Sequence, residues 1–421
     1  MRKRYKLASP VALAMLVAAL MVPGQLASAQ AAGLTVQVSE ELLVGANCDP
    51  ATGSGCRTGE SMRFLAPTLN VHAGDTITFD FHGFHTASLL PVGADALAFR
   101  SANTGGVGKP FSALIQDPDD TTLEGAAADK PALKTNPAVE QTSIGGVAAD
   151  CGSAADPCSY TGNEVVNSGL PLGPPPVTFS VTINAAPGQS FWVECFLHTH
   201  MFLRVNVVAP TAAATTQAEV DAAKASQVAY DQEWAEATDA KLINKQSSHT
   251  TSSGQKVYDV FAGKDSHTAN LNAFYPRRTA IPKGATVRYH WSQLVYEDHT
   301  VTMPAPSAFS LFEHFFAPQC DPDTDSGPAA DTEGDPTSQD PATFCPDPSQ
   351  LETDLSSQAF WGTGNGIFNG ASDIEHSGFR GAQARNDHMD VKFRARSNKK
   401  GWKFFCMLHP MQGRVVVKPT T

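Results

Sequence analysis

The chain is an internal duplication, and this constrains its fold more than any other feature. "FLAPTLNVHAGDTITFDF" at 64–81 and "AFYPRRTAIPKGATVRYHW" at 273–291 share an aromatic residue, a proline, a small-residue turn and an alternating strand. Each strand leads to a His-Thr step, at His85 and His299. The distance from that histidine to a cysteine in an apolar run is 110 positions to Cys195 and 107 to Cys406. We therefore expect one fold to occur twice.

The repeated unit has the pattern of an all-β fold. Short alternating segments such as "VTFSVTI" and "DVKFRAR" are bounded by Gly- and Pro-rich stretches, and each precedes a cysteine run and a final strand. Such strands predict a β-sandwich in each half. We place the first domain at 33–210 and the second at 255–421. Residues 211–254 are Ala-rich and then polar, which predicts a helical linker ending in a flexible joint.

The first 29 residues have the features of a secretory signal peptide. "MRKRYK" is basic, "VALAMLVAALMV" is apolar, and "LASA" offers a cleavage site near Ala29. The apolar run is too short for a comfortable membrane span, and no later segment is apolar enough to cross a bilayer. We expect a secreted or periplasmic protein.

The charge of the chain limits the classes of partner. The formal net charge is −12, and the leader contributes four basic residues to it, so the remainder is more acidic still. Such a surface repels nucleic acid and anionic membranes. A basic redox protein is the partner we expect, and the sequence does not predict an oligomeric state.

The eight cysteines fall into two kinds. Six lie in polar loops and form three local pairs that we predict to be disulfides: Cys48 with Cys56, Cys151 with Cys158, and Cys320 with Cys345. Cys195 and Cys406 instead lie in the apolar runs "SFWVECFLHTHMFLRVNVV" and "GWKFFCMLHPMQGRVVV". These two could pair with each other, but the residues that follow them favour another role.

Each unpaired cysteine is followed by a histidine and a methionine on one turn between two strands. The first set is Cys195, His198 and Met201 with the upstream His85, and the second is Cys406, His409 and Met411 with His299. A thiolate, two imidazoles and a weak thioether form the ligand set of blue-copper electron-transfer sites. The sequence therefore predicts two type 1 copper sites per chain. A buried Cys/His core pair is the simpler alternative, but its repetition in register argues against it.

These residues resemble the cupredoxins, in particular the plastocyanin and amicyanin type. "CFLHTHM" has the short Cys-x2-His-x2-Met spacing of the amicyanin-like loop. "CMLHPMQGRVVV" has the His-Pro and Met-x-Gly ending, but is one residue shorter between His409 and Met411. The resemblance implies two tandem Greek-key sandwiches and leaves the axial role of Met411 open. It also implies that His198 and His409 lie near the surface as points of electron entry and exit.

Three function classes remain. An exported dicopper electron carrier fits the sequence best. A multicopper oxidase or nitrite reductase-like enzyme would need further histidines, yet Phe196 and Met407 follow the cysteines and "HTH" is the one His-x-His. Copper storage, delivery or resistance normally uses exposed Met- and His-rich clusters, which nine scattered methionines do not provide.

The remaining histidines that we considered are not predicted to be ligands. We expect His200 to be exposed, His82 to face away from His85, and His290 to serve packing or a hydrogen bond. His376 and His388 could lie on the surface or beside a metal ligand.

Overall fold

The structure is a computed structural model. It describes residues 33–96, 151–169, 177–196, 198, 201–291, 299–304, 318–320, 351–353, 362–378, 380 and 388–419, with the backbone alone at 318–320 and 351–353. Within these residues the chain is mostly β-strand with one helix. The predicted leader, His200 and Cys345 lie outside the described residues, as does the side chain of Cys320.

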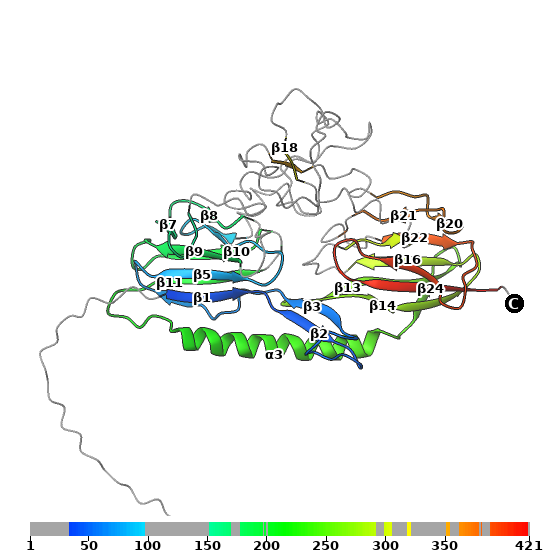
Figure 1. Cartoon of the computed structure of the whole chain (residues 1–421), viewed down its shortest axis with the longest axis horizontal. Helices are drawn as coiled ribbons and strands as arrows, with labels where there is room; N and C mark the ends of the chain where they lie inside the picture. The colour runs from blue at the N-terminus through cyan, green and yellow to red at the C-terminus, as the bar shows by residue number, and fades with distance from the viewer. Residues whose placement is uncertain are drawn as a thin grey trace, which may run out of the picture.

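The first half forms two sheets packed face to face (Figure 1). One has the order β1-β5-β9-β7 and the other β4-β11-β10-β6-β8. Their strands are β1 (Gly33–Val38), β4 (Leu69–Val71), β5 (Thr76–Phe81), β6 (Ser88–Leu89), β7 (Cys158–Tyr160), β8 (Val166–Asn167), β9 (Val177–Ile183), β10 (Ser190–Glu194) and β11 (Phe202–Val207). Buried side chains alternate along β5, as expected for a sheet with one face on the core.

The second half repeats this arrangement. Its sheets contain β13-β16-β22-β20 and β15-β24-β23-β17-β21. These strands are β13 (Lys256–Asp265), β15 (Arg278–Pro282), β16 (Thr286–Trp291), β17 (Thr302–Met303), β20 (Ile367–Phe368), β21 (Glu375–His376), β22 (His388–Phe393), β23 (Trp402–Phe405) and β24 (Gln412–Lys418). A further small pair joins β18 (Pro318–Cys320) and β19 (Leu351–Thr353).

The two halves match strand for strand, including the direction of pairing. β1 is parallel to β5 as β13 is to β16, and β4 is parallel to β11 as β15 is to β24. The strands on either side of each unpaired cysteine run antiparallel, β10 with β11 and β23 with β24. The duplication seen in the sequence is thus a duplication of β topology.

The domain boundary predicted at residue 210 does not divide the strands cleanly, because one segment before it belongs to a sheet of the second half. β2 (Glu41–Val44) and β3 (Arg57–Ser61) form a hairpin that extends the sheet of the second half, because β3 pairs with β14 (Ala269–Tyr275) and β14 pairs with β13. Figure 1 shows this hairpin reaching from the first half to the second. The predicted flexible joint also needs correction. Ser247–Thr250 forms strand β12, which pairs with β13 at the edge of the sheet.

Helix α3 (Gln217–Leu242) runs beneath both halves (Figure 1). Thr216 and Glu219 form a capping box at its N-terminus, which satisfies backbone N–H groups that the first turn leaves free. Two buried aspartates hold the helix to the hairpin: Asp231 accepts from Arg63 and Ser61, and Asp239 is paired with Arg57. Trp234 packs partly buried against the cluster between helix and sheet. The helix is therefore attached to both halves.

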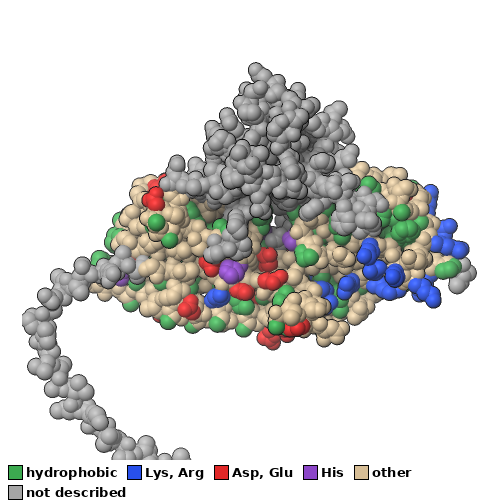
Figure 2. Space-filling view, in the orientation of Figure 1, with side chains coloured by type: hydrophobic (Ala, Val, Ile, Leu, Met, Phe, Trp, Pro, Cys, Tyr) green, Lys and Arg blue, Asp and Glu red, His purple; other side chains and the backbone are tan. Residues whose placement is uncertain are grey.

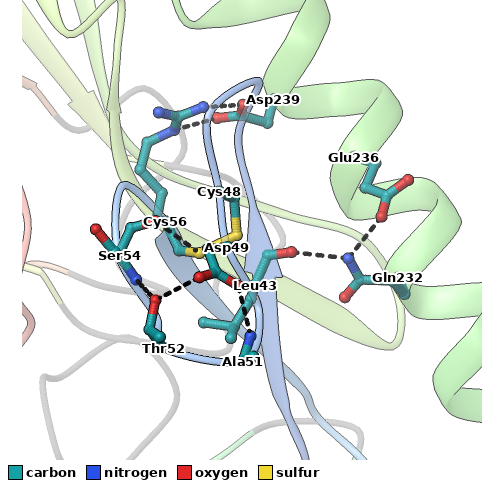
Figure 3. The surroundings of a disulfide bond; sticks show 11 residues. Leu43, Cys48, Asp49, Ala51, Thr52, Ser54, Cys56, Gln232, Glu236 and Asp239 are labelled. Atoms are coloured by element: carbon teal, nitrogen blue, oxygen red, sulfur yellow. Dashed lines mark hydrogen bonds and ion pairs between the residues drawn. A yellow bond between two sulfur atoms is a disulfide. The ribbon is translucent and has the colours of Figure 1, made fainter.

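Two predicted disulfides are present, Cys48–Cys56 and Cys151–Cys158. The first closes the tip of the β2–β3 hairpin beside α3 (Figure 3). There Gln232 of the helix donates to the carbonyl of Leu43 at 2.8 Å. No helix within the described ranges is long and apolar enough to cross a bilayer.

Candidate metal centres

The first group gathers two histidines around a buried cysteine. The Cys195 Sγ lies 3.5 Å from Nδ1 of His198 and 3.9 Å from Nδ1 of His85. The two Nδ1 atoms are 2.9 Å apart. All three residues are buried, and Cys195 is not in a disulfide. Residues 110 positions apart in the sequence thus direct one sulfur and two nitrogens at a common point.

The second group has the same form. The Cys406 Sγ lies 3.7 Å from Nδ1 of His409, and this nitrogen is 3.1 Å from Nδ1 of His299. His409 is partly exposed whereas the other two residues are buried. Cys406 is also free, so the alternative of a Cys195–Cys406 disulfide is wrong.

Strand geometry positions each group. The cysteine directly follows one strand of an antiparallel pair, and its amide donates to the carbonyl of the methionine that precedes the other strand. These bonds join Cys195 to Met201 at 3.1 Å and Cys406 to Met411 at 3.2 Å. The loop between them is thereby closed into a tight turn that carries the downstream histidine. The upstream histidine comes from the neighbouring strand connection, after β5 or β16.

The threonine of each His-Thr step braces the cysteine turn. The Thr86 amide donates to Cys195 Sγ at 3.3 Å, and its hydroxyl accepts from the Phe196 amide at 2.8 Å. Thr300 makes the equivalent bonds to Cys406 Sγ at 3.3 Å and from the Met407 amide at 2.7 Å. From the sequence these threonines were evident as a repeat, but their role was not predicted.

Both cysteines favour the thiolate form. Burial raises the pKa of Cys195, but the charge and hydrogen bonds of His198 and His85 outweigh it, and the pKa falls well below its ordinary value. The pKa of Cys406 is lowered in the same way, with His299 and His409 opposing burial. The thiolate is the form that binds metals.

The donor set fits a soft or borderline transition-metal ion. One thiolate and two imidazole nitrogens converge in a buried setting, and a metal ion would relieve the close approach of two ring nitrogens. His85, Cys195 and His198 can hold one ion, and His299, Cys406 and His409 can hold another. Met201 and Met411 are buried in the cores that contain the cysteines.

The other histidines take separate positions. His82 lies 3.3 Å from Asp80, with its side chain substantially exposed, and does not join His85 in the metal group. His290 lies 2.8 Å from Asp259, which confirms the predicted hydrogen bond. His376 is buried and bonds to the hydroxyl of Thr302, whereas His388 is exposed on β22.

Two features near the histidines were not predicted. Glu60 lies 3.2 Å from Nε2 of His85, although it belongs to the hairpin in the other sheet. Gly263, with φ of +76°, lies against the ring of His299, and a Cβ there would be 2.2 Å from Nε2. No local sequence pattern marks either residue, because both act through contacts between distant segments.

Comparison with known proteins gives distant likenesses. No family model and no curated protein sequence matches the chain. The chain is similar to a blue copper oxidase from Nitrosomonas europaea, at 10% identity and a TM-score of 0.17, over 65% of this chain and 64% of that one. A copper nitrite reductase from the same organism has 12% identity and a TM-score of 0.16, over 92% and 94%. A nitrite reductase from Thermus scotoductus has 11% identity and a TM-score of 0.17, over 93% and 68%.

The chain spans less than two thirds of the length of the first of these structures. At such low TM-scores the likenesses do not bear on function. The assignment of two metal centres rests on the residues described above: a free buried cysteine and two histidines, found twice in matching strand positions.

Proposed function

We propose that this chain is an exported cupredoxin-type protein that binds two type 1 copper ions and transfers electrons between redox partners. The observation that carries the proposal is the pair of equivalent groups, each with one free buried cysteine between two imidazole Nδ1 atoms. A copper ion held by such a set supplies a one-electron couple between Cu(II) and Cu(I). Met201 and Met411, which are buried in the same cores as the cysteines, would supply weak thioether ligands.

The chain's own residues prepare the centres for this role. The sandwich fixes the upstream histidine on one strand connection and the cysteine on another, so that the donors are preorganised. The amides of Thr86 and Thr300 donate to the sulfurs, which removes charge density from each thiolate and limits the freedom of the turn. Little rearrangement is then needed when the charge of the bound ion changes.

We propose that a redox partner approaches the second centre at its downstream histidine. His409 is partly exposed, in keeping with the proposed place of electron entry or exit. Lysines and arginines gather on the face of the second half that Figure 2 shows, although the whole chain is acidic. We propose a redox protein as partner, with a basic one favoured by the overall charge.

The hairpin offers a route between the two centres. Glu60 contacts His85, and its backbone amide donates to the side-chain oxygen of Asn270 at 2.7 Å. Asn270 pairs with Asp265 of β13, the strand in which Gly263 lies against His299. The proposed function therefore includes a relay between the halves.

Electron exchange tests this function. The copper-loaded protein is reduced by a one-electron donor in a stopped-flow instrument, and the electrons accepted per chain are counted. We expect two for the parent protein and one each for Cys195→Ser and Cys406→Ser. A protein that binds copper but accepts no electrons reversibly would support storage or delivery instead.

A further inference from the structure

The two centres differ at the outer nitrogen of the upstream histidine. Nδ1 of His85 faces the Cys195 sulfur, and Nε2 lies 3.2 Å from the Glu60 carboxylate. A metal ion bound at Nδ1 would leave the ring proton on Nε2, which would then donate to Glu60. His85 is fully buried, whereas the Glu60 side chain is 23% exposed. The contact thus places a carboxylate directly behind one metal ligand.

The second centre lacks this contact. Nε2 of His299 is buried and has no hydrogen-bond partner among the described residues. Gly263 lies against this nitrogen, and any side chain there would collide with the ring. The carboxylate behind His85 therefore has no counterpart behind His299 in the described part of the second half.

The duplication identifies what changed between the halves. Val38 and Phe81 pair in the first half as Ala262 and Trp291 pair in the second, so the next residue, Ser39, is equivalent to Gly263. Both have left-handed backbones, with φ of +68° at Ser39 and +76° at Gly263. This conformation is uncommon for a residue with a side chain and marks a site under constraint.

Ser39 uses its side chain to hold Glu60. Its hydroxyl donates to the same carboxylate oxygen at 3.2 Å, and it is fully buried. The hairpin is fixed here by the Ser39 amide, which donates to the carbonyl of Arg63 at 2.8 Å. Gly83 leaves room for the contact, because a Cβ at that position would lie 3.0 Å from the Glu60 oxygen.

We propose that Glu60 makes the two copper centres unequal, giving the first the lower reduction potential. The inference rests on the proposed function. A carboxylate that accepts from a ligand imidazole increases the basicity of that ligand. Its negative charge also favours the more highly charged Cu(II) state in a buried setting. Among the described residues, no carboxylate accepts from Nε2 of His299.

The difference gives electron flow a direction. With copper held by both groups, an electron on the first centre would pass to the second, which would oxidise the first and reduce the second by one electron each. The external donor and acceptor are the redox partners of the proposed function. Glu60 is a positioning residue, since it acts through His85.

The test measures each potential separately by optical titration with redox mediators. Cys406→Ser retains the first centre, and Cys195→Ser retains the second. We expect the first centre to have the lower potential. In the Cys406→Ser protein, Glu60→Gln should raise the potential by at least about 59 mV, a tenfold change for a one-electron couple. Glu60→Asp, which keeps the charge but shortens the side chain, should shift it in the same direction by less.

Glu41→Gln is the matched control. Glu41 pairs with Glu60 across the hairpin and is exposed, so the variant removes an equal charge without a contact to His85. An NMR spectrum of the reduced protein supplies a second readout, because the Nε2 proton of His85 should shift in Glu60→Gln and not in Glu41→Gln.

The outcomes separate this inference from the function on which it rests. If neither single-centre protein shows a thiolate-to-copper band, the proposed function fails and the inference with it. If both bands are present but Glu60→Gln and Glu41→Gln shift the potential equally, the role of Glu60 alone is refuted. A first centre with a potential equal to or above that of the second would also overturn it.

Discussion

At the scale of single residues, each centre depends on groups that leave room for a ring or fix the cysteine turn. Gly263 allows the ring of His299 to lie against β13, since both its backbone conformation and its missing side chain are needed. The threonine after each upstream histidine provides two hydrogen bonds to the cysteine turn. Neither role requires the metal, so both can be tested in the folded chain.

Gly263→Ala should remove copper from the second centre and leave the first loaded. The new Cβ would lie 2.2 Å from Nε2 of His299 and would displace the ring. Gly284→Ala is the control, because Gly284 has φ of +84° but nothing within 4 Å of its Cβ position. Gly284→Ala should keep both coppers and lower the free energy of unfolding by about 1–3 kcal/mol, because alanine is strained in this backbone conformation. Copper per chain and the free energy of unfolding are measured for both, and two coppers retained in Gly263→Ala would contradict the prediction.

Thr300→Val should destabilise the protein by about 1–3 kcal/mol, because the buried amide of Met407 loses its acceptor. Thr86→Val should lower the free energy of unfolding by a similar amount, because the Phe196 amide loses its acceptor. Thr76→Val is the matched control. The Thr76 hydroxyl forms a hydrogen bond with the hydroxyl of Thr182 at a partly buried position. Thr76→Val should therefore change the free energy of unfolding by no more than about 0.5 kcal/mol. Urea denaturation measures all three, and equal costs for Thr300→Val and Thr76→Val would refute the bracing role.

At the scale of elements, the hairpin and helix α3 form the connection between the halves. Asp231 is fully buried and accepts from Arg63, Ser61 and Thr268. It thus binds the hairpin, the helix and the start of β14 at one point. Burial of a carboxylate is costly unless its oxygens are satisfied, and here several donors satisfy them.

Asp231→Ala should therefore lower the free energy of unfolding by about 3–5 kcal/mol, because it leaves Arg63 and two hydroxyl groups without their acceptor. Asp390→Ala provides the comparison. Asp390 pairs with Arg288 on an exposed sheet face and should cost about 0–1 kcal/mol. Thermal and chemical denaturation can compare the two variants. A cost for Asp231→Ala as small as that for Asp390→Ala would show that this point does not hold the elements together.

The elements also show what the sequence could and could not predict. The alternating strands and six metal-directed residues are marked by local patterns that occur twice, and the helix by a single Ala-rich stretch. The placement of β2–β3 depends on pairing between residues about 210 positions apart, such as Glu60 with Asn270, and "RTGES" has no hydrophobic pattern that identifies its sheet. The role of Glu60 could not be predicted because it requires that pairing.

At the scale of the whole molecule, the shared sheet and helix join two sandwiches that would otherwise be separate units. The hairpin leaves the first half immediately after β1 and completes the sheet of the second. Loss of either half would expose the apolar surface between α3 and β14. The molecule should consequently behave as one cooperative unit.

We expect a single thermal transition for the full chain without metal, with a calorimetric enthalpy equal to the van't Hoff enthalpy. The double variant Asp231→Ala, Arg57→Ala should divide it into two transitions, because both attachments of the hairpin to the helix are removed. Differential scanning calorimetry distinguishes these cases. Two resolved transitions in the parent chain would contradict the proposed coupling.

The most direct test of the central claim is the copper content and visible spectrum of the oxidised mature protein. We predict two copper ions per chain and an intense thiolate-to-copper band, half of which is lost in Cys195→Ser and the other half in Cys406→Ser. One copper per chain would mean that one of the two cysteine groups is not a metal centre. Copper binding without a thiolate band, or no copper at all, would contradict the account.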